Sequence, residues 1–283
     1  MSSEKQSTKR ILVPTDFTKV VDYALDHAVK LANTMGAEVY LLHLVPDMDD
    51  QEVMQRRLDG EKARAKAINA TVPLKTMLRK GNVYDGIGDA AKEIGAELII
   101  MGTHGMRGMQ FITGSRALRV VTNSAVPFIV VQERGLKADG YRDIVVPMDL
   151  QRETRQTLGM VAAMATYFKG TAHVIVPKES DAFLHKQLQD NLIYAKRYFE
   201  ERKISMQATV AEASSNGFVK AVLQHAEQID ADLIAVMNMV GSNIFGALGA
   251  PYEEDIITNK AMIPVLMLNP ANNTSGTSGW TFQ

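Results

Sequence analysis

The segment at residues 102–116 has the residue types best suited to binding chemistry in this 283-residue sequence. Gly102, Gly105 and Gly108 directly follow an apolar run, and Gly114 precedes a run with helical spacing. Glycines let backbone N–H groups approach an anion closely, and the start of a helix presents further free N–H groups at a positive dipole end. The backbone of this segment is therefore a candidate phosphate-binding loop.

Side chains in the same segment fit that interpretation. Ser115 would cap the helix and could also hydrogen-bond a phosphate, while Arg107 and Arg116 could add charge-assisted contacts. His104 could approach the same ligand, although a single histidine names no reaction. The pattern also fits a plain surface loop with a serine cap, so both interpretations stay open.

Asp16 is the second candidate, because it lies between an apolar run at 11–14 and a run with helical spacing from residue 18. A carboxylate at this point either caps the start of the helix, which stabilises it by about 1 kcal/mol, or accepts a hydrogen bond from a ligand N–H such as a base amine. Asp149 repeats the position in the second half of the chain, which also suits a structural role.

Several function classes are excluded by what the sequence lacks. It has no cysteine, which excludes disulfides, thiolate metal sites and a cysteine nucleophile. Its six histidines do not show metal-ligand spacing, and we predict no metal site and no catalytic residues. Gly86 and Gly88 imitate part of a dinucleotide fingerprint but lie inside a helical pattern. The net charge of −1 provides no basic field for nucleic acid or an anionic membrane.

The chain repeats itself. Residues 11–16 return as 144–149, and residues 126–131 return as 263–268. Such a long period indicates a duplicated domain rather than a solenoid. We therefore expect two domains, 1–138 and 139–270, joined near a polar stretch that contains two glycines, and a flexible tail at 271–283.

Within each half, strand-like runs alternate with helical ones, which predicts an α/β fold with helices on both faces of a parallel sheet. Gly36 and Gly95 follow helical runs as C-terminal caps. An apolar stripe from Phe183 to Phe199 predicts an amphipathic helix, and His43 lies in an apolar strand as an expected core histidine. In the first half we expect strands at 11–14, 39–45, 75–79, 97–101 and 128–131, and helices at 18–35, 51–70, 84–94 and 115–122.

The corresponding loop in the second half lacks the phosphate-binding features. Met237 stands in place of Gly102, Ala250 stands in place of Ser115, and no cation lies between them. A methionine side chain would occupy the space in which backbone should approach a phosphate. We therefore predict that the second site is degenerate.

Residues 233–252 carry no charge and are long enough to test as a membrane span. A spanning helix needs about 20 predominantly apolar residues, whereas this stretch contains three glycines and a proline, so we expect a strand and a glycine-rich loop. The first ten residues are polar and do not resemble a signal peptide. Together with the lack of cysteine, these features predict a cytoplasmic protein with no membrane partner.

Five motifs together resemble the universal stress protein family. They are residues 13–16, 42–44, 98–105, 114–115 and 126–131. The chain is similar to a tandem member, with two such domains in one polypeptide. The resemblance implies that each domain is a doubly wound, five-stranded parallel sheet of strand order 3-2-1-4-5.

The resemblance also implies a ligand, ATP with or without Mg²⁺, in the first domain. Asp16 would contact adenine, the Leu44 main chain would help to hold the base, and Met101 and Gly102 would approach ribose and phosphate. The loop departs from the family spacing, since eight residues rather than nine separate Gly105 from Gly114. The complete expected site is Pro14, Thr15, Asp16, Leu44, Met101, Gly102, His104, Gly105, Arg107, Gly114, Ser115 and Arg116.

Three functional hypotheses follow. The first is a stress-response protein that binds ATP or a related nucleotide as a regulatory ligand, with slow or no hydrolysis. The second is a nucleotide-independent interaction and dimerisation module, and the third is a weak ATPase that uses Asp16 or His104. The resemblance further implies that the fifth strands of the two domains pair within the chain and that chains form homodimers. The apolar loop 240–248 is a candidate contact surface, but it could equally pack on its own domain.

Overall fold

The computed structural model describes residues 8–103, 114–238 and 252–270. The first half contains β1 (Arg10–Pro14), α1 (Val20–Met35), β2 (Glu38–Val45), α2 (Gln51–Ile68), β3 (Leu74–Lys80), α3 (Val83–Ile94), β4 (Leu98–Gly102), α4 (Gly114–Thr122) and β5 (Phe128–Val131). The second half contains β6 (Asp143–Pro147), η1 (Arg152–Gln156), α5 (Thr157–Phe168), β7 (Thr171–Val176), α6 (Ala182–Glu200), β8 (Ser205–Val210), η2 (Ser215–Gly217), α7 (Phe218–Gln228), β9 (Leu233–Met237), α8 (Tyr252–Ile257) and β10 (Val265–Leu268). Every element predicted for the first half is present, with ends shifted by at most two residues.

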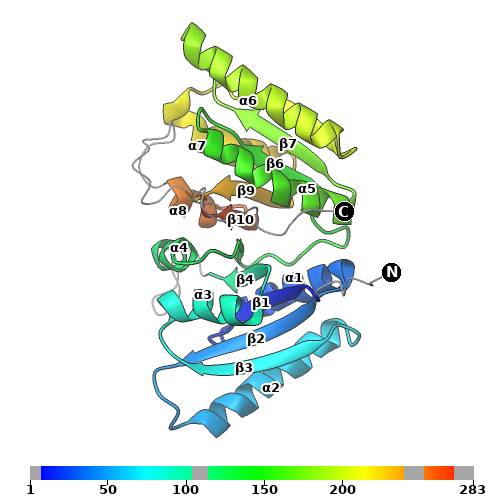
Figure 1. The fold of residues 1–283 in the computed structure, drawn as a ribbon, viewed down its shortest axis with the longest axis vertical. Helices are drawn as coiled ribbons and strands as arrows, with labels where there is room; N and C mark the ends of the chain where they lie inside the picture. The colour runs from blue at the N-terminus through cyan, green and yellow to red at the C-terminus, as the bar shows by residue number, and fades with distance from the viewer. Residues whose placement is uncertain (1–7, 104–113, 239–251, 271–283) are drawn as a thin grey trace, which may run out of the picture.

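The strands form one sheet in the order β3-β2-β1-β4-β5-β10-β9-β6-β7-β8, with helices on both faces (Figure 1). Counted within each half, the order is 3-2-1-4-5, and neighbouring strands of a half are parallel. The predicted α/β class and doubly wound order are therefore confirmed. The five strands of each half lie edge to edge with those of the other half, so that together they form a single ten-stranded sheet.

The junction between the halves is an antiparallel pair of β5 and β10. Ile129 faces Leu266, with Val130 opposite Val265 on one side and Phe128 opposite Met267 on the other. An antiparallel ladder pairs N–H and C=O groups that an exposed sheet edge would leave open. The two halves therefore share backbone hydrogen bonds as well as side-chain packing.

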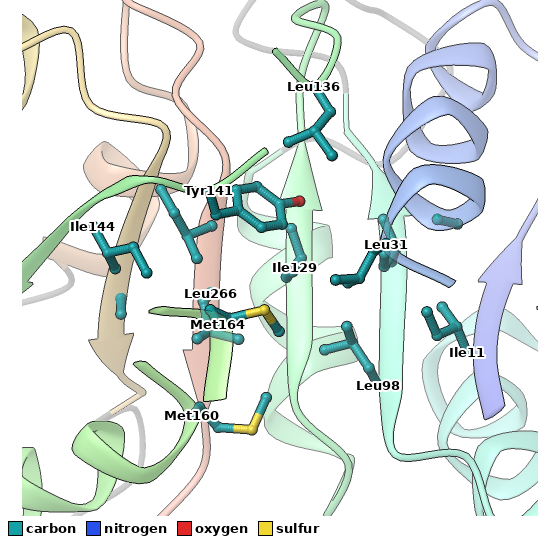
Figure 2. Packing of buried hydrophobic residues seen from close by; sticks show 14 of the residues in the cluster. Ile11, Leu31, Leu98, Ile129, Leu136, Tyr141, Ile144, Met160, Met164 and Leu266 are labelled. Atoms are coloured by element: carbon teal, nitrogen blue, oxygen red, sulfur yellow. The ribbon is translucent and has the colours of Figure 1, made fainter. Parts of the chain in front are cut away.

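The buried side chains form one apolar cluster on each face of the sheet. Ile11 of β1 belongs to the cluster that packs against α1, α2, α5 and α6, while its neighbour Leu12 belongs to the cluster beneath α3, α4, α7 and α8. This alternation is what a strand covered on both faces requires. Figure 2 shows the first cluster running from Leu98 through Ile129 to Leu266, across the junction of the halves.

The segment that connects the halves is bonded to the first half through a buried histidine. His27 of α1 is fully buried, with Nδ1 2.7 Å from the Tyr141 hydroxyl and Nε2 2.9 Å from the Arg134 carbonyl oxygen. Burial lowers the pKa of His27 to about 4, so the ring is neutral at pH 7. Since Nε2 must donate to the carbonyl, Nδ1 accepts from the Tyr141 hydroxyl.

The same segment is bonded to the second half by charged side chains. The Lys137 ammonium lies 2.8 Å from a carboxylate oxygen of Asp230 and 2.8 Å from one of Asp232. The Arg134 guanidinium adds a contact of 2.9 Å to Asp230. The polar stretch expected to separate the domains is therefore bonded to both halves, to the first through His27 and to the second through Asp230 and Asp232.

Helix α6 departs from the apolar stripe predicted for it. Phe183 is 74% exposed, whereas Asn191 of the same helix is fully buried. Asn191 tolerates burial because its amide donates to the Asp149 carbonyl oxygen at 2.7 Å and its Oδ1 accepts from Arg155 Nε at 2.9 Å. Apolar spacing alone does not reveal a buried polar residue of this kind.

Within the described ranges, no helix combines the length and apolar character that crossing a membrane requires. The uncharged stretch 233–252 begins as strand β9, as predicted. Residues 239–251, which include the proposed contact surface 240–248, lie outside the described residues, as does the predicted tail 271–283.

Candidate functional site

A pocket of about 80 Å³ lies at the carboxyl ends of β1, β2 and β4, beside the start of α3. In a doubly wound sheet, this is the edge at which ligands bind. Six of the predicted site residues come from three separate segments and line it together: Pro14, Thr15, Asp16, Leu44, Met101 and Gly102. The remaining lining residues are Val21, Leu42, His43, Val83 and Ile87.

The other predicted site residues are not among the described residues that line this pocket. His104, Gly105 and Arg107 lie outside the described residues. Gly114 and Ser115 are the first two residues of α4, and Arg116 is exposed on the same helix. A phosphate-binding role for these six residues stays a prediction.

Asp16 shapes a tight turn between β1 and α1. Its Oδ1 accepts hydrogen bonds from the Thr18 backbone N–H at 3.0 Å and from the Thr18 hydroxyl at 2.6 Å, an Asx turn in which Phe17 has a left-handed φ of 63°. Helix α1 therefore begins at Val20, with Lys19 at the N-cap position, and Asp16 does not cap it. Asp16 is exposed, and its Oδ2 makes no hydrogen bond within the described part of the chain, so it can accept one from a ligand.

His43 is a pocket residue rather than the core histidine that the strand pattern predicts. It is half-buried, and its Nδ1 lies 2.8 Å from the Thr15 carbonyl oxygen, so Nδ1 donates a hydrogen bond to that oxygen. Its ring centroid lies 4.4 Å from that of Phe17. Sequence reasoning missed one signal: His43 lies near the end of β2, and β2 pairs with β1, the strand that precedes Asp16.

A glycine inside α3 explains how that helix reaches the pocket. A Cβ placed on Gly86 would lie 3.0 Å and 3.1 Å from the two methyl carbons of Leu44. The glycine therefore allows α3 to approach the end of β2 closely. As predicted, Gly86 and Gly88 lie within a helix and not in a dinucleotide-binding turn.

Gly102 permits a second close approach, between β4 and the start of α1. A Cβ at Gly102 would lie 2.9 Å from Val20 Cγ1 and 3.1 Å from the Val20 carbonyl oxygen. The contact with Val20 Cγ1 is shorter than real Cβ atoms show and the one with the backbone oxygen is tight, so substitution at Gly102 would shift Val20 as well as disturb any ligand. It is therefore a poor position at which to test binding.

Comparisons with known proteins identify the family. The model of the universal stress protein family matches residues 7–132. Over 140 aligned residues the chain is 31% identical to a universal stress protein of Methanocaldococcus jannaschii, in an alignment that covers 44% of this chain and 82% of that protein. The chain belongs to the universal stress protein family.

Two further comparisons concern a second relative in sequence and a solved structure. A universal stress protein of Thermus aquaticus is 30% identical over 135 residues, which cover 44% of this chain and 98% of that protein. The crystal structure of a universal stress protein from Archaeoglobus fulgidus aligns with a TM-score of 0.70 and 17% identity, and the alignment covers 93% of this chain and 97% of that chain. The second comparison shows a shared fold along nearly the whole chain.

In the second half of this universal stress protein, two residues that correspond to pocket-lining residues are buried. The strand register aligns Gly102 with Met237, which is 1% exposed. Phe218 begins α7 as Val83 begins α3, but Val83 is 38% exposed whereas Phe218 is fully buried. Phe218 belongs to the same apolar cluster as residues of β7 and β9, which correspond to the pocket-lining strands β2 and β4.

The carboxylate that corresponds to Asp16 is also enclosed. Asp149 is 3% exposed, and its Oδ1 accepts a hydrogen bond from the Gln151 N–H at 2.8 Å. Burial raises the pKa of Asp149 to about 6, and nearby Glu153 acts in the same direction, against the hydrogen bond from Gln151. An equivalent residue is therefore exposed at a pocket in one half and desolvated in the other.

Replacing Asp149 with asparagine should increase stability more at high pH than at low pH. The raised pKa means that the stabilising contribution of the protonated carboxyl is fully present below about pH 4 and is lost as pH rises through about 6. Asparagine keeps the oxygen that accepts from Gln151 and cannot ionise. Chemical unfolding should show the variant gaining about 1.5 kcal/mol over the native chain between about pH 5 and about pH 8.

The exposed Asp190 provides the matched control for this measurement. Asp190→Asn should leave the pH dependence of unfolding unchanged. A pH profile of Asp149→Asn that runs parallel to that of the native chain would show that this carboxyl titrates normally.

Proposed function

We propose that this universal stress protein binds ATP, as Mg·ATP, in the pocket at the carboxyl ends of β1, β2 and β4, as a regulatory ligand with slow or no hydrolysis. The observation that supports this most directly is the convergence of Asp16, Leu44 and Met101–Gly102 on one pocket from three segments. The free carboxylate oxygen of Asp16 suits a base amine, and the apolar side chains of Val83 and Ile87 suit the face of a base.

The size of the pocket indicates which part of the ligand it would hold. Pockets that enclose a whole small molecule measure about 300–1,000 Å³, so a cavity of about 80 Å³ holds part of a nucleotide, and we assign it to the base. The ribose and phosphates would extend past Gly102 toward the first residues of α4, Gly114 and Ser115, where free N–H groups and the helix dipole favour an anion.

We further propose that the chain is a tandem of two domains, 1–138 and 139–270, with one nucleotide site. The antiparallel pairing of β5 with β10 supports a built-in pair of domains. The buried Phe218, Met237 and Asp149 support a second domain that has lost the site. The second domain would then act as a fixed partner of the first, through which nucleotide binding could be sensed.

The experiment that tests the proposal is the nucleotide content of the purified chain, followed by titration with Mg·ATP. We expect about one nucleotide per chain. Asp16→Asn should weaken binding about tenfold, because it removes the charged acceptor for the base amine while its amide oxygen still accepts from Thr18. Asp149→Asn, at the equivalent position of the second half, is the matched control and should leave the affinity unchanged.

Other outcomes identify the remaining hypotheses. A chain that carries no nucleotide and does not bind ATP at millimolar concentration would be an interaction module, and the proposal would fail. Mg²⁺-dependent turnover that is lost in Asp16→Ala would identify a weak ATPase.

A further inference from the structure

A second cavity, of about 330 Å³, lies between the C-terminal ends of α5 and α6 and the starts of β7 and β8. Three cationic side chains line it, those of Lys169, Arg202 and Lys203, and we call it the three-cation pocket. None of the described residues that line it is acidic. Its volume lies at the lower end of the range for small-molecule sites.

Two of the three cations of this pocket have no side-chain partner among the described residues, and the third has weak ones. The Lys169 and Lys203 side chains make no hydrogen bond or ion pair with residues in the described ranges. Arg202 donates to the Tyr198 carbonyl oxygen at 3.0 Å and lies 3.7 Å from a carboxylate oxygen of Glu201. Both members of that ion pair are exposed, so the pair is weak, and the Arg202 guanidinium also lies over the Tyr198 ring, 3.7 Å from its centroid. An anion would compete with these exposed contacts for Arg202.

Comparison of the two halves shows that all three cations are specific to the second. Through the strand register, their counterparts in the first half are uncharged. These counterparts are Gly36, Ala70 and Thr71. The second half is the more acidic one, since residues 139–283 contain 12 Lys and Arg against 16 Asp and Glu, a net charge of −4. A generally basic composition therefore does not explain three cations at one cavity.

The backbone at both lysines makes their placement more specific. Lys169 and Lys203 have left-handed φ angles of 53° and 57°, a conformation that favours glycine at the end of a helix. Gly36, the counterpart of Lys169, has a φ of 67° and follows that preference. The second half thus carries lysine at two positions where the left-handed backbone conformation favours glycine, which has no side chain.

The chemistry of the pocket selects the class of ligand. The N–H groups of Gly170, Lys203 and Ile204 already donate to backbone carbonyls, so an anion would be held by side chains. Three cations and the exposed Ser205 hydroxyl match a group with several oxygens and a charge of about −2, as a phosphate monoester has. We propose that the three-cation pocket binds a phosphate-bearing small molecule, at a site separate from the proposed ATP pocket.

The test uses the full chain and inorganic pyrophosphate, followed by NMR of the backbone amides of Gly170 and Ser205. We expect saturable shifts of both signals that weaken as NaCl is raised from about 20 to about 200 mM. Lys169→Gln with Lys203→Gln should weaken binding at least tenfold. Lys178→Gln with Lys186→Gln, which removes two exposed lysines elsewhere in the second half, should leave the affinity unchanged.

Two further variants keep the result interpretable. Lys169→Gly reproduces the cap of the first half, so it should fold with an equal or higher melting temperature and still bind pyrophosphate more weakly. Val83→Phe, which is designed to close the ATP pocket, should leave these shifts intact, so failure of one site is distinguishable from failure of the other. The proposal would be overturned if the two double-lysine variants bound pyrophosphate with equal affinity. It would also be overturned if the chain bound RNA but did not bind pyrophosphate.

Discussion

ATP affinity should fall at least about 100-fold when Val83 is replaced by phenylalanine, because the larger ring fills the space assigned to the base. The second half already shows this substitution, since Phe218 begins α7 at the corresponding place and is fully buried. Val83 is 38% exposed, so the ring can enter the pocket without overpacking the core. Titration of Mg·ATP into the purified variant measures the loss, and an unchanged melting temperature shows that the fold is intact.

Phe218→Val is the reciprocal control for that prediction. It makes a cavity in the second half and should lower stability, while the ATP affinity of the first half stays at the native value. A Val83→Phe chain that binds ATP as tightly as the native chain would mean that the base lies elsewhere. The assignment of the pocket would then be wrong even if the protein binds ATP.

The stability of the chain should fall by about 3–5 kcal/mol when Tyr141 is replaced by alanine, which is among the largest effects expected of a single core substitution. Tyr141 is fully buried in the segment between the halves, and Figure 2 shows it beside Ile129 and Leu136. Its ring packs edge-on against Phe168 with centroids 5.5 Å apart, and its hydroxyl donates to His27. The substitution removes both contacts and leaves a buried histidine nitrogen without its donor.

Denaturant unfolding followed by circular dichroism measures this loss, and two variants separate its parts. Tyr141→Phe keeps the ring and should cost only about 1–2 kcal/mol, the value of the hydrogen bond to His27. Tyr194→Ala removes a tyrosine that is 43% exposed and should cost less than about 1 kcal/mol. If Tyr141→Ala and Tyr194→Ala lowered the free energy of unfolding equally, the packing of Tyr141 in the segment between the halves would not contribute to holding them together.

Local patterns accounted for the helices and strands because each depends on residues close in sequence. Gly36 and Gly95 end α1 and α3 with φ angles of 67° and 62°, the conformation that makes glycine a helix terminator. Helix α1 began two residues later than predicted because Asp16 and Thr18 close a turn of their own. The joining of two sheets into one depends on strands in different halves, and no local periodicity specifies such a pairing.

The candidate site was only partly accessible to sequence reasoning. Asp16 and Gly102 could be found because each lies at the carboxyl end of a predicted strand, where ligands bind in such a sheet, and within a motif that resembles the family. His43 could not be assigned, since its neighbours Leu42 and Leu44 give it the pattern of a buried strand. Phe218 looks like an ordinary apolar start of a helix, and its meaning emerges only when its burial is compared with the exposure of Val83.

The antiparallel junction of β5 and β10 has a consequence for how this protein behaves at low concentration. Because both strands belong to one polypeptide, each is the neighbour of the other at a high and fixed effective concentration. Dilution cannot separate them as it separates the subunits of a dimer. The outer strands β3 and β8 are the sheet edges left for pairing with a second chain. Any signal that nucleotide binding sends across the junction of β5 and β10 would therefore be independent of the protein concentration.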